Sequence, residues 1–148
     1  MKKSILITAG LMISLAACAQ KVNESEVPAV VKDAFKKSYK DAKEVKWEKE
    51  GANFETEFEI GGTDQSVVFD ATGHLVETEV EIKVEELPSG AKDYISKNYK
   101  DTKIKEATKI TSANGTVTYE AEIKGKDLIF DSTGKFIEEE VDTHEDKD

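Results

Sequence analysis

An internal repeat constrains the fold of this chain more than any other feature. A Val-Pro step at residues 27–28 corresponds to a Leu-Pro step at residues 87–88, sixty residues later. Near the end of each copy, the sequence FDATG at residues 69–73 corresponds to FDSTG at residues 130–134, at an offset of 61. Internal repeats of this length reflect duplicated supersecondary units, so we expect two similar structural halves.

Each repeat opens with the pattern of an amphipathic helix. Apolar residues recur at helical spacing after Pro28 and again after Pro88. The rest of each repeat alternates between apolar and polar residues, as in FETEFEI at residues 54–60 and VTYEAEI at residues 117–123. A period of two is typical of antiparallel strands with one apolar face and one face in water.

Short turn sequences separate the expected strands. Asp70 and Asp131 each begin an Asp-x-Thr-Gly sequence, which suits a type I turn closed by a glycine. We therefore predict an α+β fold of two tandem helix-plus-four-strand repeats, at residues 27–85 and 86–141. The repeats are expected to form an antiparallel sheet with the helices on one face.

Residues 1–17 have the features of an export signal. Two lysines precede an apolar stretch at residues 5–15, which is too short to span a bilayer as a stable helix. The sequence LAAC at residues 15–18 resembles a bacterial lipobox, and this resemblance implies cleavage after Ala17 and acylation of Cys18. Cleavage after Ala19 is the alternative, because residues 17–19 also satisfy the pattern of an ordinary signal peptide.

The leader predicts an exported protein that is lipid-anchored in the cell envelope and faces the periplasm. A soluble periplasmic protein is the alternative. Membrane attachment is expected through the lipid anchor only. Residues 18–26 form a predicted linker to the first repeat, and the charged residues 142–148 form a predicted acidic tail.

The charge balance argues against several classes of function. The chain has 31 acidic and 21 basic residues, a formal net charge of −10, and every basic residue is a lysine. Such a chain lacks the basic clusters that hold nucleic-acid phosphates, so we expect no nucleic-acid partner. A single cysteine also excludes an internal disulfide framework and a multi-cysteine zinc site.

No group of residues indicates catalysis or a bound cofactor. His74 and His144 have no partner at the spacing of a metal site. The chain lacks the G-x-S-x-G sequence of a serine nucleophile, and Cys18 belongs to the leader cleavage site. Asp70 and Asp131 do not suggest an acid–base pair, because the repeat places each in a turn of its own. We therefore expect a protein that is not an enzyme and has no metal or cofactor.

Glutamates dominate the polar positions of the predicted strands, which makes the polar face of the sheet the candidate partner-binding surface. A carboxylate surface of this kind attracts a cationic protein or peptide. The alternative is a solvated face whose like charges suppress edge pairing and aggregation. The candidate residues are Glu55, Glu57, Glu59, Glu77, Glu79, Glu81, Glu120 and Glu122, and Glu138 and Glu140 continue the same face.

Trp47, the single tryptophan of the chain, is a further candidate for partner binding. Tryptophan is enriched among the residues that contribute most to binding energy. A core position beneath the first helix is the alternative, and we favour it because the chain has few other large apolar residues.

The order of these features resembles the PepSY-like, β-lactamase-inhibitor-like domain family. The first repeat carries the resemblance in its Val-Pro step, in Phe35 and Tyr39, and in the sequences VKWE at residues 45–48 and FDATG. The second repeat carries it in its Leu-Pro step, in Tyr99 and in FDSTG. The resemblance spans residues 27–141. It departs at Lys40 and Lys100, where members of the family often have a proline.

This resemblance implies an exported protein of a Bacteroidetes-type bacterium, with two helix-plus-four-strand repeats related to β-lactamase inhibitory protein. The family has no established catalytic residues. We therefore predict a non-enzymatic envelope protein that binds an unidentified protein or peptide through its sheet. The alternative that the family name implies is a periplasmic inhibitor or modulator of a hydrolase, either a β-lactamase or a peptidase.

Overall fold

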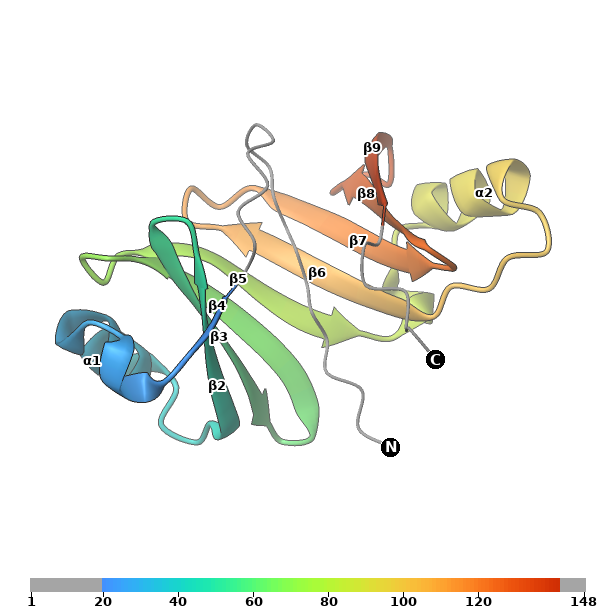
Figure 1. Cartoon of the computed structure of the whole chain (residues 1–148). Helices are drawn as coiled ribbons and strands as arrows, with labels where there is room; N and C mark the ends of the chain where they lie inside the picture. Colours follow the sequence, from blue (N-terminus) through green and yellow to red (C-terminus); the bar gives the residue numbers. More distant parts are fainter. Residues whose placement is uncertain (1–19, 142–148) are drawn as a thin grey trace. The chain divides into compact units, whose positions relative to one another are not determined.

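The computed structural model describes residues 20–141, and their hydrogen-bonded strands follow chain order from β1 to β9 (Figure 1). The first half contains β1 (Gln20–Val22), a 3-10 turn (Glu24–Glu26), α1 (Ala29–Ser38), β2 (Lys43–Glu50), β3 (Asn53–Ile60), β4 (Thr63–Asp70) and β5 (Leu75–Ile82). The second half contains a 3-10 turn (Val84–Glu86), α2 (Ser89–Asn98), β6 (Glu106–Ser112), β7 (Val117–Ile123), β8 (Lys126–Asp131) and β9 (Phe136–Val141). These elements confirm the predicted α+β fold of two helix-plus-four-strand repeats.

The chain divides between Thr78 and Glu79, inside β5, into two compact units. We call them unit 1 and unit 2. The predicted boundary between the sequence repeats lies elsewhere, between residues 85 and 86. It stays a prediction, because it was drawn from the repeated sequence, whereas the two compact units are defined by packing. The short strand β1 lies within the predicted linker at residues 18–26 and pairs with β2. Sequence pattern did not predict it, because three residues are too few to show a period.

Proline and tyrosine delimit the helix of each unit. The Pro28 carbonyl accepts hydrogen bonds from the backbone N–H groups of Val31 and Lys32, both at 3.1 Å. At the other end, the Tyr39 N–H donates to the Phe35 carbonyl at 2.8 Å. A helix of ten residues is only marginally stable alone in water, so α1 and α2 depend on packing against the strands.

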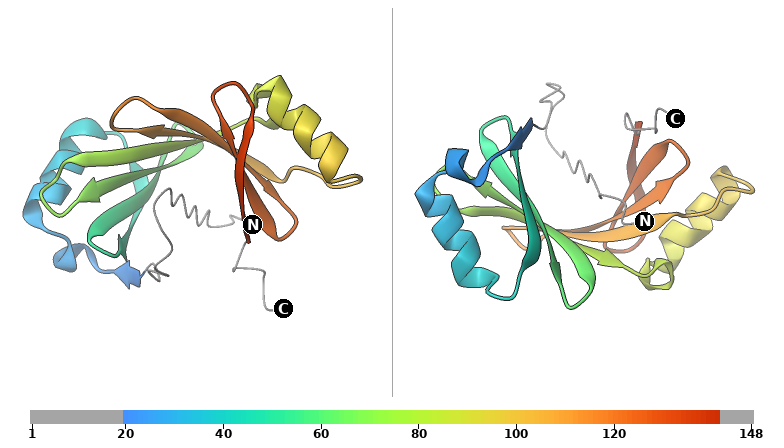
Figure 2. Two further views of the ribbon diagram at one scale, coloured as in Figure 1. Left: turned by 90° about the horizontal axis from the view of Figure 1, so that it is seen from above. Right: turned by 60° about the horizontal axis from the view of Figure 1, so that its bottom comes forward.

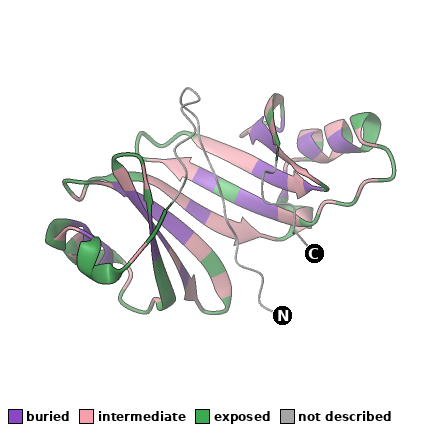
Figure 3. Cartoon of the chain, in the orientation of Figure 1, coloured by how far each residue is buried: buried purple, intermediate pink, exposed green. Residues whose placement is uncertain are grey.

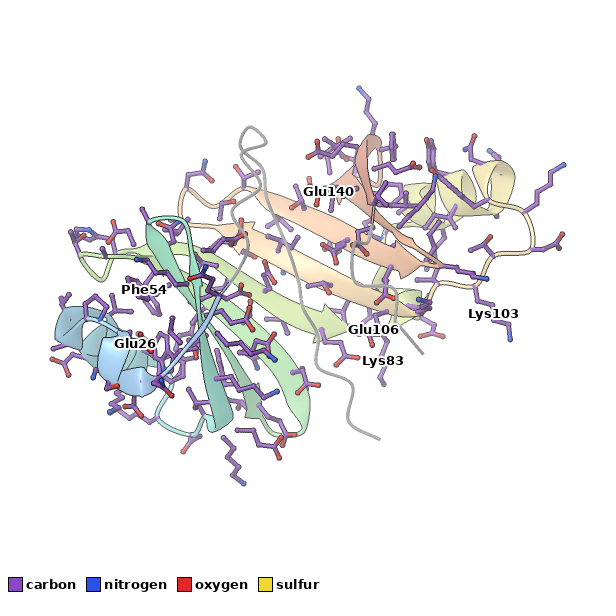
Figure 4. The ribbon with its side chains drawn as sticks, viewed as in Figure 1. Glu26, Phe54, Lys83, Lys103, Glu106 and Glu140 are labelled. Atoms are coloured by element: carbon purple, nitrogen blue, oxygen red, sulfur yellow. The ribbon has the colours of Figure 1, made fainter. Side chains whose placement is uncertain are left out.

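In unit 1, α1 packs against the apolar face of β2, β3 and β4 (Figure 2). The Phe35 ring meets Trp47 edge-on, with ring centroids 5.4 Å apart, and meets Phe58 at 5.1 Å. Phe54 lies on the same side of β3 (Figure 4). The core of unit 1 is therefore an aromatic cluster beneath one short helix.

In unit 2, aromatic residues occupy different positions of the same fold. The Tyr94 ring of α2 stacks on Phe136 of β9, with centroids 4.5 Å apart and planes 6° apart. Their counterparts in unit 1 are the smaller Ala34 and Leu75. Conversely, Ala107 replaces Trp47. Each unit thus has an aromatic cluster of its own, built from different strands. Buried residues lie along the strands of both units (Figure 3).

The Asp-x-Thr-Gly sequence forms the predicted turn and contacts the helix of its unit. Asp131 accepts hydrogen bonds at one carboxylate oxygen from the Thr133 N–H at 2.8 Å and the Lys135 N–H at 3.0 Å. Gly134 has φ +84°, and a Cβ at this position would lie 2.7 Å from the Ala91 nitrogen. Only glycine therefore allows the turn to approach the first turn of α2.

Among residues 20–141, no helix is long and apolar enough to cross a membrane.

Replacing Gly134 with alanine tests this close approach, and Gly115 supplies a matched control. Gly115 has φ +87°, and a Cβ added there would have nothing within 4 Å, so Gly115→Ala introduces only the backbone strain, about 1 kcal/mol. Gly134→Ala adds a clash with backbone atoms, and we expect it to lower the free energy of unfolding by about 2–4 kcal/mol. Urea unfolding followed by circular dichroism measures both. Equal losses of unfolding free energy in the two variants would show that the Gly134 turn is not in close contact with α2.

Candidate functional site

The predicted glutamates occupy alternate strand positions, but part of this face is closed to water. On β3, Glu55 lies on the face opposite α1, with Glu48 of β2 and Val68 of β4 as its neighbours across the sheet. Glu55, Glu79 and Glu120 are only 6%, 1% and 7% exposed. The expectation of a solvated glutamate face is therefore wrong at these three positions.

The other candidate glutamates remain partly exposed. This group comprises Glu57, Glu59, Glu77, Glu81, Glu122, Glu138 and Glu140. Lysines accompany two of them: the Lys46 Nζ lies 3.8 Å from Glu57, and the Lys105 Nζ lies 2.9 Å from Glu122. Ion pairs at partly exposed positions contribute little to stability, so most of the electrostatic repulsion among the glutamates remains.

Glu55 is the centre of a first carboxylate cluster, which we define as Glu48, Glu50, Glu55 and Glu57. Burial is the main cause that raises the pKa of Glu55 to about 8. A hydrogen bond with Ser66 acts in the opposite direction, and the charges of the three other cluster members add to the increase. The Glu55 carboxyl is therefore mostly protonated at neutral pH.

Glu120 is the centre of a second carboxylate cluster, which we define as Glu106, Glu120, Glu122, Asp127 and Glu140. Burial is again the main cause that raises its pKa to about 8, and the four neighbouring carboxylates raise it further. Those four neighbours form one row across β6, β7, β8 and β9. Glu106 and Glu140 end the row and are labelled in Figure 4.

The two central glutamates are equivalent in the repeat. Glu55 and Glu120 are 65 residues apart, the offset that also relates β3 to β7. Each lies between a residue of the preceding strand and an aliphatic residue of the next one, Val68 in unit 1 and Ile129 in unit 2. With both carboxyls protonated, the folded chain carries about two negative charges fewer than its formal −10 near pH 7.

Sequence reasoning missed Glu48, Glu50, Glu106 and Asp127 as members of these clusters. The missing signal was strand register. The Gly51-Ala52 turn pairs Glu50 with Asn53 and so places Glu48 opposite Glu55. A two-residue hairpin loop fixes the register in this way, so the first cluster was accessible from the sequence.

Trp47 takes the core position that we favoured. It is 6% exposed and packs edge-on against Phe35. Its remaining exposed edge lines an open hollow beside α1. Trp47 is thus held by the core of unit 1 and does not project from the surface.

The described histidine belongs to a turn. His74 is exposed, and its Nδ1 lies 2.8 Å from the Thr72 hydroxyl and 3.4 Å from Asp70. A hydrogen bond from Thr72 is the main cause that lowers the pKa of Asp70 to about 2, as expected for a carboxylate that organises a turn. His144 and Cys18 lie outside the described residues. Within residues 20–141, no three His, Cys, Asp or Glu side chains are grouped to hold a metal ion.

Glu55 and Glu120, with their raised pKa values, predict an unusual dependence of stability on pH. In the unfolded chain each loses its proton near pH 4.5, whereas the folded protein keeps it up to about pH 8. The unfolded state therefore binds fewer protons in this range, and the free energy of unfolding falls as the pH rises from about 4.5 to 8. In the variant Glu55→Gln/Glu120→Gln we expect a shallower fall and a stabilisation on the order of a few kcal/mol at pH 8.

Urea unfolding at a series of pH values measures this effect, with Glu85→Gln, which removes an exposed carboxylate outside the clusters, as the matched control. An unchanged slope in the double variant would show that neither carboxyl retains its proton in the folded state.

Comparisons with known proteins place the chain in a family. A family model described as "putative beta-lactamase-inhibitor-like, PepSY-like" matches residues 15–77 and 52–138. No curated protein matches the chain. Among solved structures, it is similar to a protein of Bacteroides eggerthii described as "putative periplasmic", with 17% identity and a TM-score of 0.70, over 78% of this chain and 88% of the other.

A DUF2874 family protein of Bacteroides uniformis is 21% identical with a TM-score of 0.68, over 77% of this chain and 88% of the other. A BLIP-like protein of Bacteroides fragilis is 22% identical with a TM-score of 0.61, over 82% and 91%. At these identities the structures show a shared fold. The match of the family model over both repeats shows that the chain belongs to the PepSY-like, beta-lactamase-inhibitor-like family.

Proposed function

We propose that this is a non-enzymatic exported protein that binds a cationic protein or peptide through its carboxylate clusters. The observation that carries this proposal is the presence of a buried glutamate among other carboxylates at the same place in both units. Burial and like charge both oppose ionisation there, so the arrangement costs stability near neutral pH.

A bound cationic partner offsets this loss of stability. A lysine or arginine side chain placed beside Glu55 or Glu120 favours the ionised carboxylate and lowers its pKa. Binding then releases a proton and creates a charge-assisted interaction that the free protein lacks. The partly exposed members of the two clusters supply the negative potential that draws the cation to the site.

The proposal places the protein in the cell envelope. Support comes from the lipobox-like sequence that ends at Cys18 and from one solved structure of similar fold, from Bacteroides eggerthii, that is described as "putative periplasmic". A lipid on Cys18 would hold the binding clusters at the membrane surface, with a soluble periplasmic form as the alternative.

Isothermal titration with a defined cationic peptide tests the proposal. The probe is an acetylated and amidated octapeptide of alternating Lys and Val, and its counterpart with Glu in place of Lys is the negative control. We expect proton release on binding, measured by comparing buffers of different ionisation enthalpy, and an affinity that rises between pH 6 and pH 8. Glu55→Gln/Glu120→Gln is expected to bind more weakly and to release no protons.

The matched control variant is Glu85→Gln/Asp93→Asn, which removes two carboxylates from exposed positions outside the clusters. It keeps the proton release of the wild type if the buried glutamates are responsible. Equal weakening by the two double variants, or binding without proton release, would contradict the proposal.

A second candidate function is inhibition or modulation of a hydrolase. The description of the family and the similarity to a BLIP-like protein favour it. Assays of β-lactamases and envelope peptidases with purified protein separate the two candidates. The second candidate is supported if micromolar protein inhibits an enzyme and the Glu55→Gln/Glu120→Gln variant inhibits it equally. The absence of inhibition excludes this candidate for the enzymes tested.

A further inference from the structure

The strand β9 forms the outer edge of unit 2. It pairs with β8 on one side, and within residues 20–141 no strand pairs with its other side. Every residue of β9 is at least partly exposed, whereas Leu128, Ile129 and Phe130 of the neighbouring β8 are buried. An edge strand of this kind presents backbone N–H and C=O groups that can pair with a further strand.

The second carboxylate cluster reaches this edge. The row of carboxylates that Glu106 begins on β6 ends on β9, where Glu140 pairs with Asp127. Two residues away, Glu138 lies on the same face of β9 and continues the row that contains Glu120. A side chain on a strand added beyond β9 would therefore stand next to these carboxylates.

Glu120, at the centre of this cluster, is buried without a hydrogen bond. It is 7% exposed, and within residues 20–141 no group forms a hydrogen bond with its carboxyl. Glu55 differs, because Ser66 supplies such a hydrogen bond in unit 1. A cation at the edge of β9 offsets the charge of Glu140, one of the four carboxylates that oppose ionisation of Glu120.

On the other face of β9 the charge is already compensated. Glu139 accepts a hydrogen bond from the Tyr99 hydroxyl, and the Lys126 Nζ lies 2.6 Å from the same carboxylate. Further along this face, Val141 is 69% exposed. One face of the edge strand thus presents two carboxylates, and the other presents an apolar side chain beside a carboxylate that is already paired.

The charge of β9 argues against pairing with a second copy of the chain. Such a pair would bring residues 138–140 of the two copies together, and like charges directly opposite one another destabilise paired strands. The edge strand of unit 1, β1, carries Lys21 and no acidic residue, so it repels cations. The edge at β9 therefore fits an extended segment that is cationic on one face and apolar on the other.

We propose that the cationic peptide binds as an added strand along the outer edge of β9, a geometry that rests on the proposed function and specifies it for unit 2. Lysine or arginine side chains at alternate positions of the segment lie beside Glu138 and Glu140. The apolar side chains between them cover Val141. The backbone of the segment pairs with that of β9, so main-chain hydrogen bonds contribute to the affinity as well as charge.

Backbone methylation of the octapeptide of alternating Lys and Val separates strand pairing from charge. In an extended strand the N–H groups of successive residues point to opposite edges, so all lysine N–H groups face one edge and all valine N–H groups the other. Two probes carry N-methyl groups on every Lys or on every Val, and both keep the charge of the parent peptide. In calorimetry we expect one of them to bind at least about tenfold more weakly than the other, because it loses the backbone hydrogen bonds to β9.

Amide hydrogen exchange locates the added strand. We expect the parent peptide to slow the exchange of the β9 N–H groups that point away from β8, while the N–H groups of β1 stay unchanged and serve as the internal reference. Glu138→Gln/Glu140→Gln is expected to weaken binding about fivefold, as the loss of two cross-strand charge pairs predicts. Glu85→Gln/Asp93→Asn is the control with the same change in net charge.

Equal affinities of the two methylated peptides, or unchanged exchange in β9, would overturn the added strand. The proposed function then still stands if the parent peptide binds with proton release, whereas no binding of the parent peptide would overturn both. Slow exchange of β9 in the free protein, together with a dimer in size-exclusion chromatography, would assign the edge to a second copy of the chain and overturn the proposal as well.

Discussion

One short helix per unit can cover only one face of the strands, and this constraint determines how the rest of each unit is built. The apolar residues of β2, β3 and β4 gather beneath α1, and those of β7 and β8 gather beneath α2. Alternation then directs every second residue to the opposite face. Glutamate is the commonest residue at these positions of β2, β3 and β7, so the face without a helix is closed in part by carboxyl groups that cannot all ionise.

Much of the fold followed from two sequence patterns, the period of the apolar residues and the repeat of the turns. Both patterns depend on local geometry, which neighbouring residues fully specify. Burial of Glu55, Glu79 and Glu120 does not follow from them, because it depends on how closely side chains of adjacent strands crowd each position. The alternation of apolar and polar residues indicates the face of the strand on which a residue lies. It does not indicate how exposed that face is to solvent. Hairpin register could have added Glu48 to the site, since the Gly51-Ala52 turn fixes its partner.

The two units show how a duplicated fold can diverge while its framework stays the same. The helix-starting prolines, the helix-ending tyrosines and the Asp-x-Thr-Gly turns are shared, because each has a backbone role in positioning the helix. Large aromatic residues are not shared. Trp47 fills one end of unit 1, whereas Tyr94 and Phe136 fill a different part of unit 2. The buried glutamates persist in both units although they contribute nothing to the apolar core, which is the main reason to connect them with binding.

The central claim is that Glu55 and Glu120 remain protonated in the folded protein at neutral pH. NMR titration of the glutamate side-chain carboxyl carbons measures this directly, with the two signals assigned by their loss in Glu55→Gln and Glu120→Gln. We expect both carboxyls to titrate near pH 8. Titration of both buried groups near pH 4.5 would contradict the claim and, with it, the proposed proton release on binding.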